Sequence, residues 1–178
     1  KAMDNRASVL AMVETMKQLS TRKHDADVYF VATVQEEVGA AGAEIAAYNI
    51  DPDIAIVIDA CHGEMPDCPK DSIFSLGKGP AIGVGPVLHR NLYRKLVDVA
   101  KEENIPYQID VEPGNTGTEA WETQVSRSGI PTALLSIPVR YMHTPVETLD
   151  VNDVKNTGKL AADFVSMPAK EMEGLLCF

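Results

Sequence analysis

The 178-residue sequence has few cysteines, few aromatic side chains and no long apolar run. Its three cysteines, Cys61, Cys68 and Cys177, form no CxxC pair and are odd in number. Reduced thiols in a cytosolic protein explain such a set most simply, so we expect a cytoplasmic location. No apolar run approaches the roughly 18 residues of a membrane span, and no signal-peptide pattern opens the sequence.

Basic residues are also scarce relative to acidic ones. The sequence holds 16 Lys and Arg against 26 Asp and Glu, which gives a formal net charge of −10. This balance disfavours nucleic acid and anionic membrane surfaces as partners. An apolar content of 45% over this length is that of a globular domain with a substantial core.

Periodic apolar segments alternate in type along the chain, which predicts an α/β fold. Helical spacing predicts helices over about 5–19, 40–50, 89–104, 119–127 and 150–167. Short apolar runs predict strands over 27–34, 53–59, 105–112 and 130–137, whereas the glycines and prolines of 77–86 indicate turns. This alternation is typical of a largely parallel mixed sheet with helices on both faces, a three-layer α/β/α domain.

Two adjacent glutamates, Glu36 and Glu37, lie one residue after the predicted buried strand Asp27–Val34. Neighbouring carboxylates repel, and each resists ionisation beside the other. We therefore expect them at a strand end only if cations hold at least one of them. The alternative is that both are ordinary surface charges at the start of a loop.

Other groups able to bind a metal lie at the ends of further elements: Asp4, Asp59 and His143. Two of them have a plainer explanation, because Asp4 is a favourable helix cap and Asp59 can cap the element that follows it. Carboxylates with an imidazole suit Zn²⁺, Co²⁺ or Mn²⁺. Two such ions about 3.5–4 Å apart would activate a water and polarise a carbonyl.

Five segments together resemble successive motifs of the glutamyl aminopeptidase / cellulase M family: KAMDNR at 1–6, VQEEVGAAGA at 34–43, IDA around Asp59, GTEA at 117–120 and RYMHTPVE at 140–147. The resemblance implies a zinc-peptidase-like catalytic domain and two divalent ions, zinc or cobalt with manganese also possible. It further implies peptide substrates and homo-oligomers, dodecamers in the full-length protein.

The resemblance also assigns roles to individual residues. Asp4 would bridge the two metals, Glu37 and His143 would complete one site, and Asp59 would belong to the other. Glu36 would be the general base. A cis peptide bond would join Asp4 to Asn5.

Substrate contacts are implied at Gly117, Thr118 and Glu119, although the family's usual GTDA is GTEA here. Arg140 could bind a substrate carboxylate, and an ion pair with Glu147 or Asp150 is an equally good explanation for it.

Counting ligands exposes a gap in the second metal site, where this sequence supplies only Asp4 and Asp59. The family fills it with a histidine well before the bridging aspartate, and inserts a β-rich oligomerisation domain between the two. We therefore expect residues 1–178 to be the carboxyl-terminal part of a metallopeptidase catalytic domain, without its N-terminal part and the β-rich insert.

The leading hypothesis is an aminopeptidase that removes N-terminal residues from peptides through a metal-activated water, with Glu36 as general base. The alternatives are a related dinuclear hydrolase, such as a deacylase or carboxypeptidase, and a metal-free structural or assembly subunit. A cellulase finds no support, because its paired carboxylic acids work without metals.

Overall fold

A four-stranded sheet forms the centre of the domain in a computed structural model that describes residues 1–66, 68 and 73–176. The strands are β1 (Ala55–His62), β2 (Ala81–Val84), β3 (Gln108–Val111) and β4 (Thr132–Val139), in the spatial order β1-β4-β2-β3. β1 pairs parallel to β4 and β2 parallel to β3, whereas β2 runs antiparallel to β4. The predicted mixed, mostly parallel sheet is confirmed.

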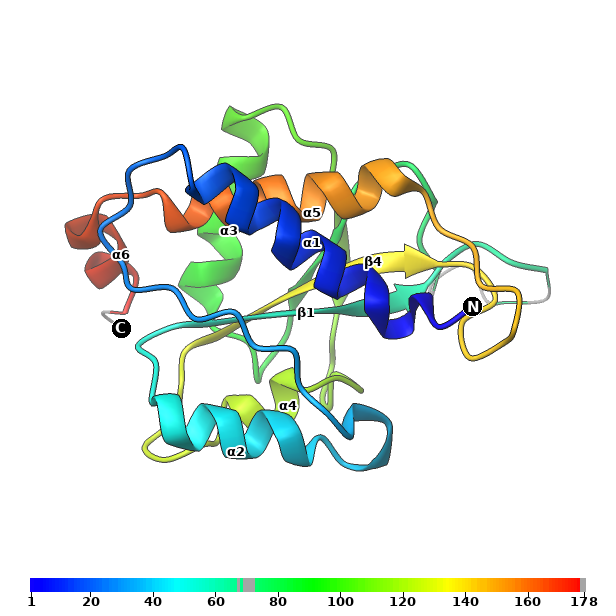
Figure 1. Ribbon diagram of the computed structural model, residues 1–178, viewed down its shortest axis with the longest axis horizontal. Helices are drawn as coiled ribbons and strands as arrows, with labels where there is room; N and C mark the ends of the chain where they lie inside the picture. Colours follow the sequence, from blue (N-terminus) through cyan, green and yellow to red (C-terminus); the bar gives the residue numbers. More distant parts are fainter. Residues whose placement is uncertain (67, 69–72, 177–178) are drawn as a thin grey trace.

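Helices cover both faces of this sheet and complete three layers (Figure 1). On one face α1 (Met3–Leu19) packs against α5 (Val151–Val165), and α3 (Arg90–Glu102) packs beside α5. On the other face lie α2 (Ala41–Ile50) and the short α4 (Ala120–Thr123). A last helix, α6 (Ala169–Leu175), follows α5. Within the described residues, no helix has the length and apolar character needed to cross a membrane.

The core lies on both sides of β4, whose eight residues are all buried. Leu135 packs with Leu96 of α3 and Phe164 of α5 on one face. The next residue back, Leu134, packs with Ala120 of α4 on the opposite face. Successive strand side chains point to opposite faces, so a continuous apolar run is what a strand covered on both faces requires.

Predicted helices were recovered where their apolar faces find a partner. Leu92, Leu96 and Ala100 of α3 are fully buried, as their helical spacing predicts. Asp150 caps α5, and its side chain accepts a hydrogen bond of 2.8 Å from Asn152 N. The predicted helix over 119–127 shortens to α4, because Ile130 N donates to Gln124 O and closes a turn there.

The turn prediction for residues 77–86 holds at both ends of the segment but is wrong in its middle, where Ala81–Val84 form strand β2. Two of its glycines allow the backbone of this segment to lie close to a neighbouring backbone. A Cβ at Gly79 would lie 1.7 Å from Pro106 O, and one at Gly85 would lie 2.0 Å from Glu112 O. Because glycine has no side chain, β2 can lie directly against the segment that contains β3.

The predicted buried strand over 27–34 is also absent. These residues are extended but join no ladder within the described chain, and Tyr29 and Val34 are 68% and 65% exposed. The segment is anchored at its end, where Gly42 N donates to Val34 O over 3.1 Å. Its composition is that of a strand, but a strand also needs a paired neighbour.

Two of the three cysteines lie in the described chain. Cys61 and Cys68 are free thiols, and burial raises the pKa of Cys61. Cys177 lies outside the described residues.

The contact between α1 and α5 yields a stability prediction. A Cβ at Gly158 would lie 2.7 Å from both Ala11 O and Glu14 Cβ. We expect Gly158→Ala to lower the free energy of unfolding by about 1–3 kcal/mol, because overpacking outweighs the better helix propensity of alanine. Urea unfolding measures this change.

Gly174→Ala in α6 is the matched control, since no atom lies within 4 Å of a Cβ there. It should be neutral or slightly stabilising. Equal effects of the two substitutions would show that close helix contact at Gly158 does not limit stability.

Candidate metal centre

Three side chains from distant segments converge at one end of the domain: Asp4 at the start of α1, Glu37 in a 3₁₀ turn (Glu36–Val38), and His143 in the loop after β4. One ligand atom from each lies within 4.8 Å of the others. His143 Nε2 is 2.9 Å from Asp4 Oδ2 and 3.4 Å from Glu37 Oε2. The Asp4–Asn5 peptide bond is cis, as the resemblance implied.

Asp59 lies beside this group but is not one of the three. It was expected at a strand end and instead lies inside β1, which continues to His62. Its Oδ1 accepts hydrogen bonds from Asn5 Nδ2 at 2.7 Å and Ala60 N at 2.8 Å.

The electrostatics of Asp59 differ from those of a surface acid. Burial, opposed by the Ala60 N–H and reinforced by the charges of Glu36 and Asp4, raises the pKa of Asp59 to about 8. Without a nearby cation, this carboxyl group retains its proton at neutral pH.

The side chains of Glu36 and Glu37 point in different directions. They lie in the 3₁₀ turn and not at the end of a sheet strand, since residues 27–34 form none. Residues of such a turn are about 120° apart, because three complete one turn. Glu37 therefore reaches His143, while Glu36 lines a groove beside β1. Burial, Glu37 and Glu119 raise the pKa of Glu36.

Backbone hydrogen bonds hold this turn in place. Gln35, immediately before it, has a left-handed φ of 66°, and Gly39, immediately after it, has a φ of 113°. Ala40 N donates to Gln35 O over 2.8 Å, and Gly39 N donates to Glu36 O over 3.1 Å. The two glutamates are thus presented by a closed turn between the extended segment and α2.

Glu147 is a functional candidate that the sequence argument missed. It is 9% exposed, and its carboxylate accepts hydrogen bonds from Met3 N at 2.6 Å and His143 N at 3.1 Å. It therefore joins the residue before Asp4 to the loop that carries His143, whose φ of 62° is left-handed. Such a conformation persists only where its surroundings hold it. The only signal in the sequence was its place four residues after His143.

The residues implied for substrate contact differ in their surroundings. The hydroxyl of Thr118 accepts a hydrogen bond from Ala120 N at 3.2 Å, and Gly117 N donates to Asn115 Oδ1 at 2.8 Å. Both residues therefore form hydrogen bonds within their own loop. Glu119 instead accepts a hydrogen bond from Thr33, and its charge contributes to the raised pKa values of Glu36 and Asp59.

Arg140 lies at a backbone bridge to Thr148, and its Nε donates to Glu64 O. The ion pairs with Glu147 or Asp150 that the sequence left open are not found in the described part of the chain.

The donor set of the centre suits a divalent transition ion. Two carboxylates and one imidazole are ligands that Zn²⁺, Co²⁺ and Mn²⁺ accept, and three protein ligands leave a position open. The side chains of His143 and Glu37 are 59% and 58% exposed, so solutes can reach them, whereas that of Asp4 is 9% exposed. Burial and Glu37 raise the pKa of Asp4, an unfavourable interaction that a cation would relieve.

Comparison with known proteins identifies relatives of this chain. A family model described as M42 glutamyl aminopeptidase matches residues 1–160. Lysyl aminopeptidase of Pyrococcus furiosus is 44% identical over 159 residues, which are 89% of this chain and 45% of that protein. The chain spans about half the length of the curated relatives it matches.

Solved structures give the same result. An aminopeptidase of the archaeon Desulfurococcus kamchatkensis has a TM-score of 0.85 at 39% identity, covering 93% of this chain and 48% of that one. The TET1 peptidase of Pyrococcus horikoshii has a TM-score of 0.74 at 33% identity, covering 93% of this chain and 48% of that one. It is described as able to assemble into a tetrahedron or a large octahedral shell.

The buried Asp59 yields a pH prediction for the metal-free chain. The unfolded state releases this proton near pH 3.8 and the folded state near pH 8. Between these values the folded state binds more protons, so the free energy of unfolding falls as pH rises, by up to about 1.4 kcal/mol per pH unit.

Asp59→Asn, which keeps an oxygen for Asn5 and Ala60, should flatten this slope. Urea unfolding at pH 5, 6, 7 and 8 with a chelator present measures it. Parallel slopes for the two proteins would contradict a proton held at Asp59.

The two hydrogen bonds of Glu147 yield a second prediction. In Glu147→Gln the amide nitrogen would face one of the two N–H donors. One of the two hydrogen bonds that join the Asp4 and His143 segments would therefore be lost. We expect Co²⁺ affinity to fall about 10–100-fold, as when partners that orient metal ligands are removed.

Glu44→Gln, the same change on the exposed face of α2, should leave Co²⁺ affinity unaltered. Calorimetric titration measures the affinity, and circular dichroism checks the fold. Unchanged Co²⁺ binding by Glu147→Gln would exclude a positioning role.

Proposed function

This chain belongs to the M42 glutamyl aminopeptidase family, and from that premise we propose that it carries most of the catalytic centre of a dinuclear metallo-aminopeptidase. Asp4, Glu37 and His143 would hold one divalent ion, zinc or cobalt, with manganese also suitable. Asp4 would bridge to a second ion beside Asp59. The substrates are peptides, cleaved after their N-terminal residue.

The observation that carries this proposal is the convergence of Asp4, Glu37 and His143 within 4.8 Å, from segments more than 30 residues apart. Two acids at this distance need positive charge between them. The Asp4 side chain is only 9% exposed, and burying an acid beside a second acid is unfavourable unless a cation offsets its charge. The arrangement therefore favours an ion site over the alternative of a metal-free assembly subunit.

In the proposed reaction Glu36 is the catalytic residue. Bound divalent ions would supply Lewis acidity that polarises the scissile carbonyl and lowers the pKa of water. The Glu36 carboxylate accepts the proton of the attacking water and later delivers it to the leaving amine. Its neighbour Glu37 is directed to His143, which leaves Glu36 free to face the groove.

The second ion receives fewer ligands from this chain. Only Asp4 and Asp59 are candidates, and the chain spans about half the length of its relatives. We therefore propose that residues 1–178 form the carboxyl-terminal part of the catalytic domain, and that polypeptide outside them completes the second site.

Self-assembly is part of the same proposal. The Pyrococcus horikoshii relative is described as forming a tetrahedral or octahedral shell. Another solved relative is described as a dodecamer. We therefore expect this protein to form a homo-oligomer, a dodecamer once the whole polypeptide is present.

Paired substitutions of the adjacent glutamates test the assignment. Glu36→Gln should lower kcat about 10²–10⁴-fold, the usual contribution of a general base, and leave Co²⁺ binding within a few-fold. Glu37→Gln should weaken Co²⁺ binding at least tenfold, because it removes a ligand charge. Co²⁺ binding is titrated on this chain, and hydrolysis of aminoacyl p-nitroanilides is measured on the whole encoded polypeptide.

Two results would contradict the proposal. Absence of Co²⁺ and Zn²⁺ binding by both this chain and the whole polypeptide would favour a metal-free subunit. Turnover of N-acylated amino acids or of carboxyl-terminal residues, with none of the aminoacyl substrates, would favour a deacylase or carboxypeptidase.

A further inference from the structure

The side chain of Asn5 joins the first turn of α1 to β1. Its Nδ2 donates a hydrogen bond of 2.7 Å to Asp59 Oδ1 and one of 3.3 Å to Ile58 O. An asparagine near the start of a helix usually caps that helix. This one instead reaches residues 53 and 54 positions further along the chain. Asn5 therefore contacts the buried acid beside the metal centre, which helix capping does not explain.

These two hydrogen bonds fix the orientation of the Asn5 amide group. A side-chain amide has two N–H donors, and here each of them faces an acceptor. Turning the amide over would place Asn5 Oδ1 against the Ile58 carbonyl, which has no proton to donate. The amide nitrogen is therefore the atom that meets Asp59, and the acid is held from one fixed side.

Asp59 has one carboxylate oxygen left for other partners. Its Oδ1 accepts hydrogen bonds from Asn5 Nδ2 and from Ala60 N, the latter at 2.8 Å. Its Oδ2 accepts none from the part of the chain that the structure describes. Rotation of the carboxyl group about its Cβ–Cγ bond would break both existing hydrogen bonds. Asp59 is thus set to present a single oxygen, Oδ2, to an ion.

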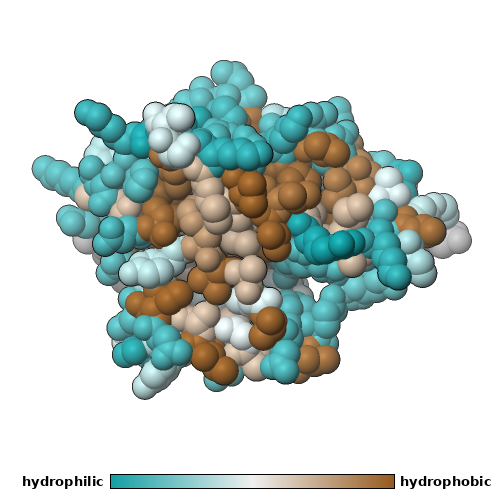
Figure 2. All heavy atoms as spheres, in the orientation of Figure 1, coloured by the Kyte–Doolittle hydropathy of each residue, from teal (hydrophilic) through white to brown (hydrophobic). Residues whose placement is uncertain are grey.

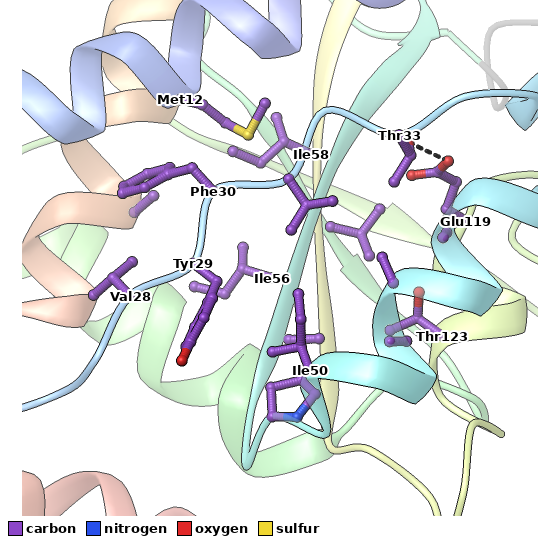
Figure 3. A pocket seen from close by; sticks show the side chains of 18 of the residues that line it. Met12, Val28, Tyr29, Phe30, Thr33, Ile50, Ile56, Ile58, Glu119 and Thr123 are labelled. Carbon is purple, nitrogen blue, oxygen red and sulfur yellow. Dashed lines mark hydrogen bonds between the residues drawn. The ribbon is translucent and has the colours of Figure 1, made fainter.

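The surroundings of β1 beside Asp59 are largely apolar, so few other donors can take the place of Asn5. Figure 3 shows Met12 of α1, Phe30 of the extended segment and Ile58 together on this side of β1. Hydrophobic side chains also gather in the hollow between α1 and α2 (Figure 2). Asp59 itself is 5% exposed. The loss of the Asn5 amide would therefore leave Asp59 Oδ1 with the Ala60 N–H alone.

We propose that Asn5 is a positioning residue, which holds Asp59 so that its Oδ2 serves the second ion and does not enter the first site. The structure keeps Asp59 out of the three-residue group whose ligand atoms lie within 4.8 Å of one another. Asn5 directly follows Asp4, the proposed bridge. One dipeptide thus places the bridging acid and the group that orients the acid of the second site. This inference rests on the proposed function, because it needs a second ion beside Asp59.

The test is a calorimetric titration of the whole encoded polypeptide with Co²⁺, of which each subunit should bind two ions. Asn5→Leu keeps the approximate shape of the side chain and removes both N–H donors. It should weaken binding of the second ion about 10–100-fold, as the loss of a partner that orients a ligand does, and leave the first within a few-fold. The visible absorption spectrum of bound Co²⁺, recorded at each addition, separates the two ions.

Two control variants separate positioning from a merely structural role. Thr15 Oγ1 joins α1 to α5 through a hydrogen bond of 3.1 Å to Gly158 O. Thr15→Val removes that bond, so it should lower the urea midpoint of unfolding and leave the ratio of the two Co²⁺ affinities unchanged. Asn152→Leu, the same substitution as Asn5→Leu at an exposed position of α5, should change neither quantity.

A second measurement examines the hydrogen bonds of Asn5 in the absence of metal. Asn5→Ala, which adds no bulk, identifies the side-chain amide signals of Asn5 in the NMR spectrum of residues 1–178. In the unsubstituted chain these protons should exchange with solvent at least about tenfold more slowly than those of exposed Asn152, because a hydrogen bond must open before exchange.

Three outcomes would overturn the inference. The unsubstituted polypeptide could bind two ions while Asn5→Leu binds both as tightly, or loses both equally, and Asn5 would then not act on Asp59 alone. Equal amide exchange at Asn5 and Asn152 would show that the hydrogen bonds are absent. An unsubstituted polypeptide that binds fewer than two ions would end the inference together with the proposed dinuclear centre, and it differs from the other outcomes because no substitution is involved.

Discussion

Repulsion among acidic side chains is the constraint on which this end of the molecule depends. Asp4, Glu36, Glu37 and Asp59 come from three segments and share one small region with a single imidazole. Glu37 raises the pKa of Asp4 and Glu36, and Glu36 and Asp4 raise the pKa of Asp59. Such an arrangement is unfavourable unless cations offset it, so the fold has to hold the acids together by other contacts.

Those contacts come from backbone groups and from one further acid. Glu147 accepts hydrogen bonds from Met3 N and His143 N and so fixes Asp4 relative to His143. The close contact of α1 with α5 at Gly158 sets the position of the helix whose first turn contains Asp4. The turn after Gln35 presents Glu36 and Glu37 in divergent directions. The centre is thus preorganised by hydrogen bonds and helix packing, as a site for a small ion requires.

Much of the fold could be predicted from local patterns. Helices α1, α3 and α5 and strand β4 have strong apolar periodicity and partners within the chain, so each was recovered to within a few residues. β2 was missed because Gly79, Gly83 and Gly85 look like turn residues until the neighbouring backbone is known. Segment 27–34 shows the converse error, since its composition is strand-like but it pairs with no strand of the described chain.

The sequence by itself determined the type of chemistry: which acids and which histidine are available, their order, and a family resemblance that spans almost the whole chain. Only the tertiary structure decided which of them meet. It brought Asp4, Glu37 and His143 within reach of one ion, set Asp59 beside them inside β1, and revealed Glu147 as their common support. The reason is physical: composition and periodicity act over a few residues, whereas convergence depends on contacts between segments more than 100 residues apart.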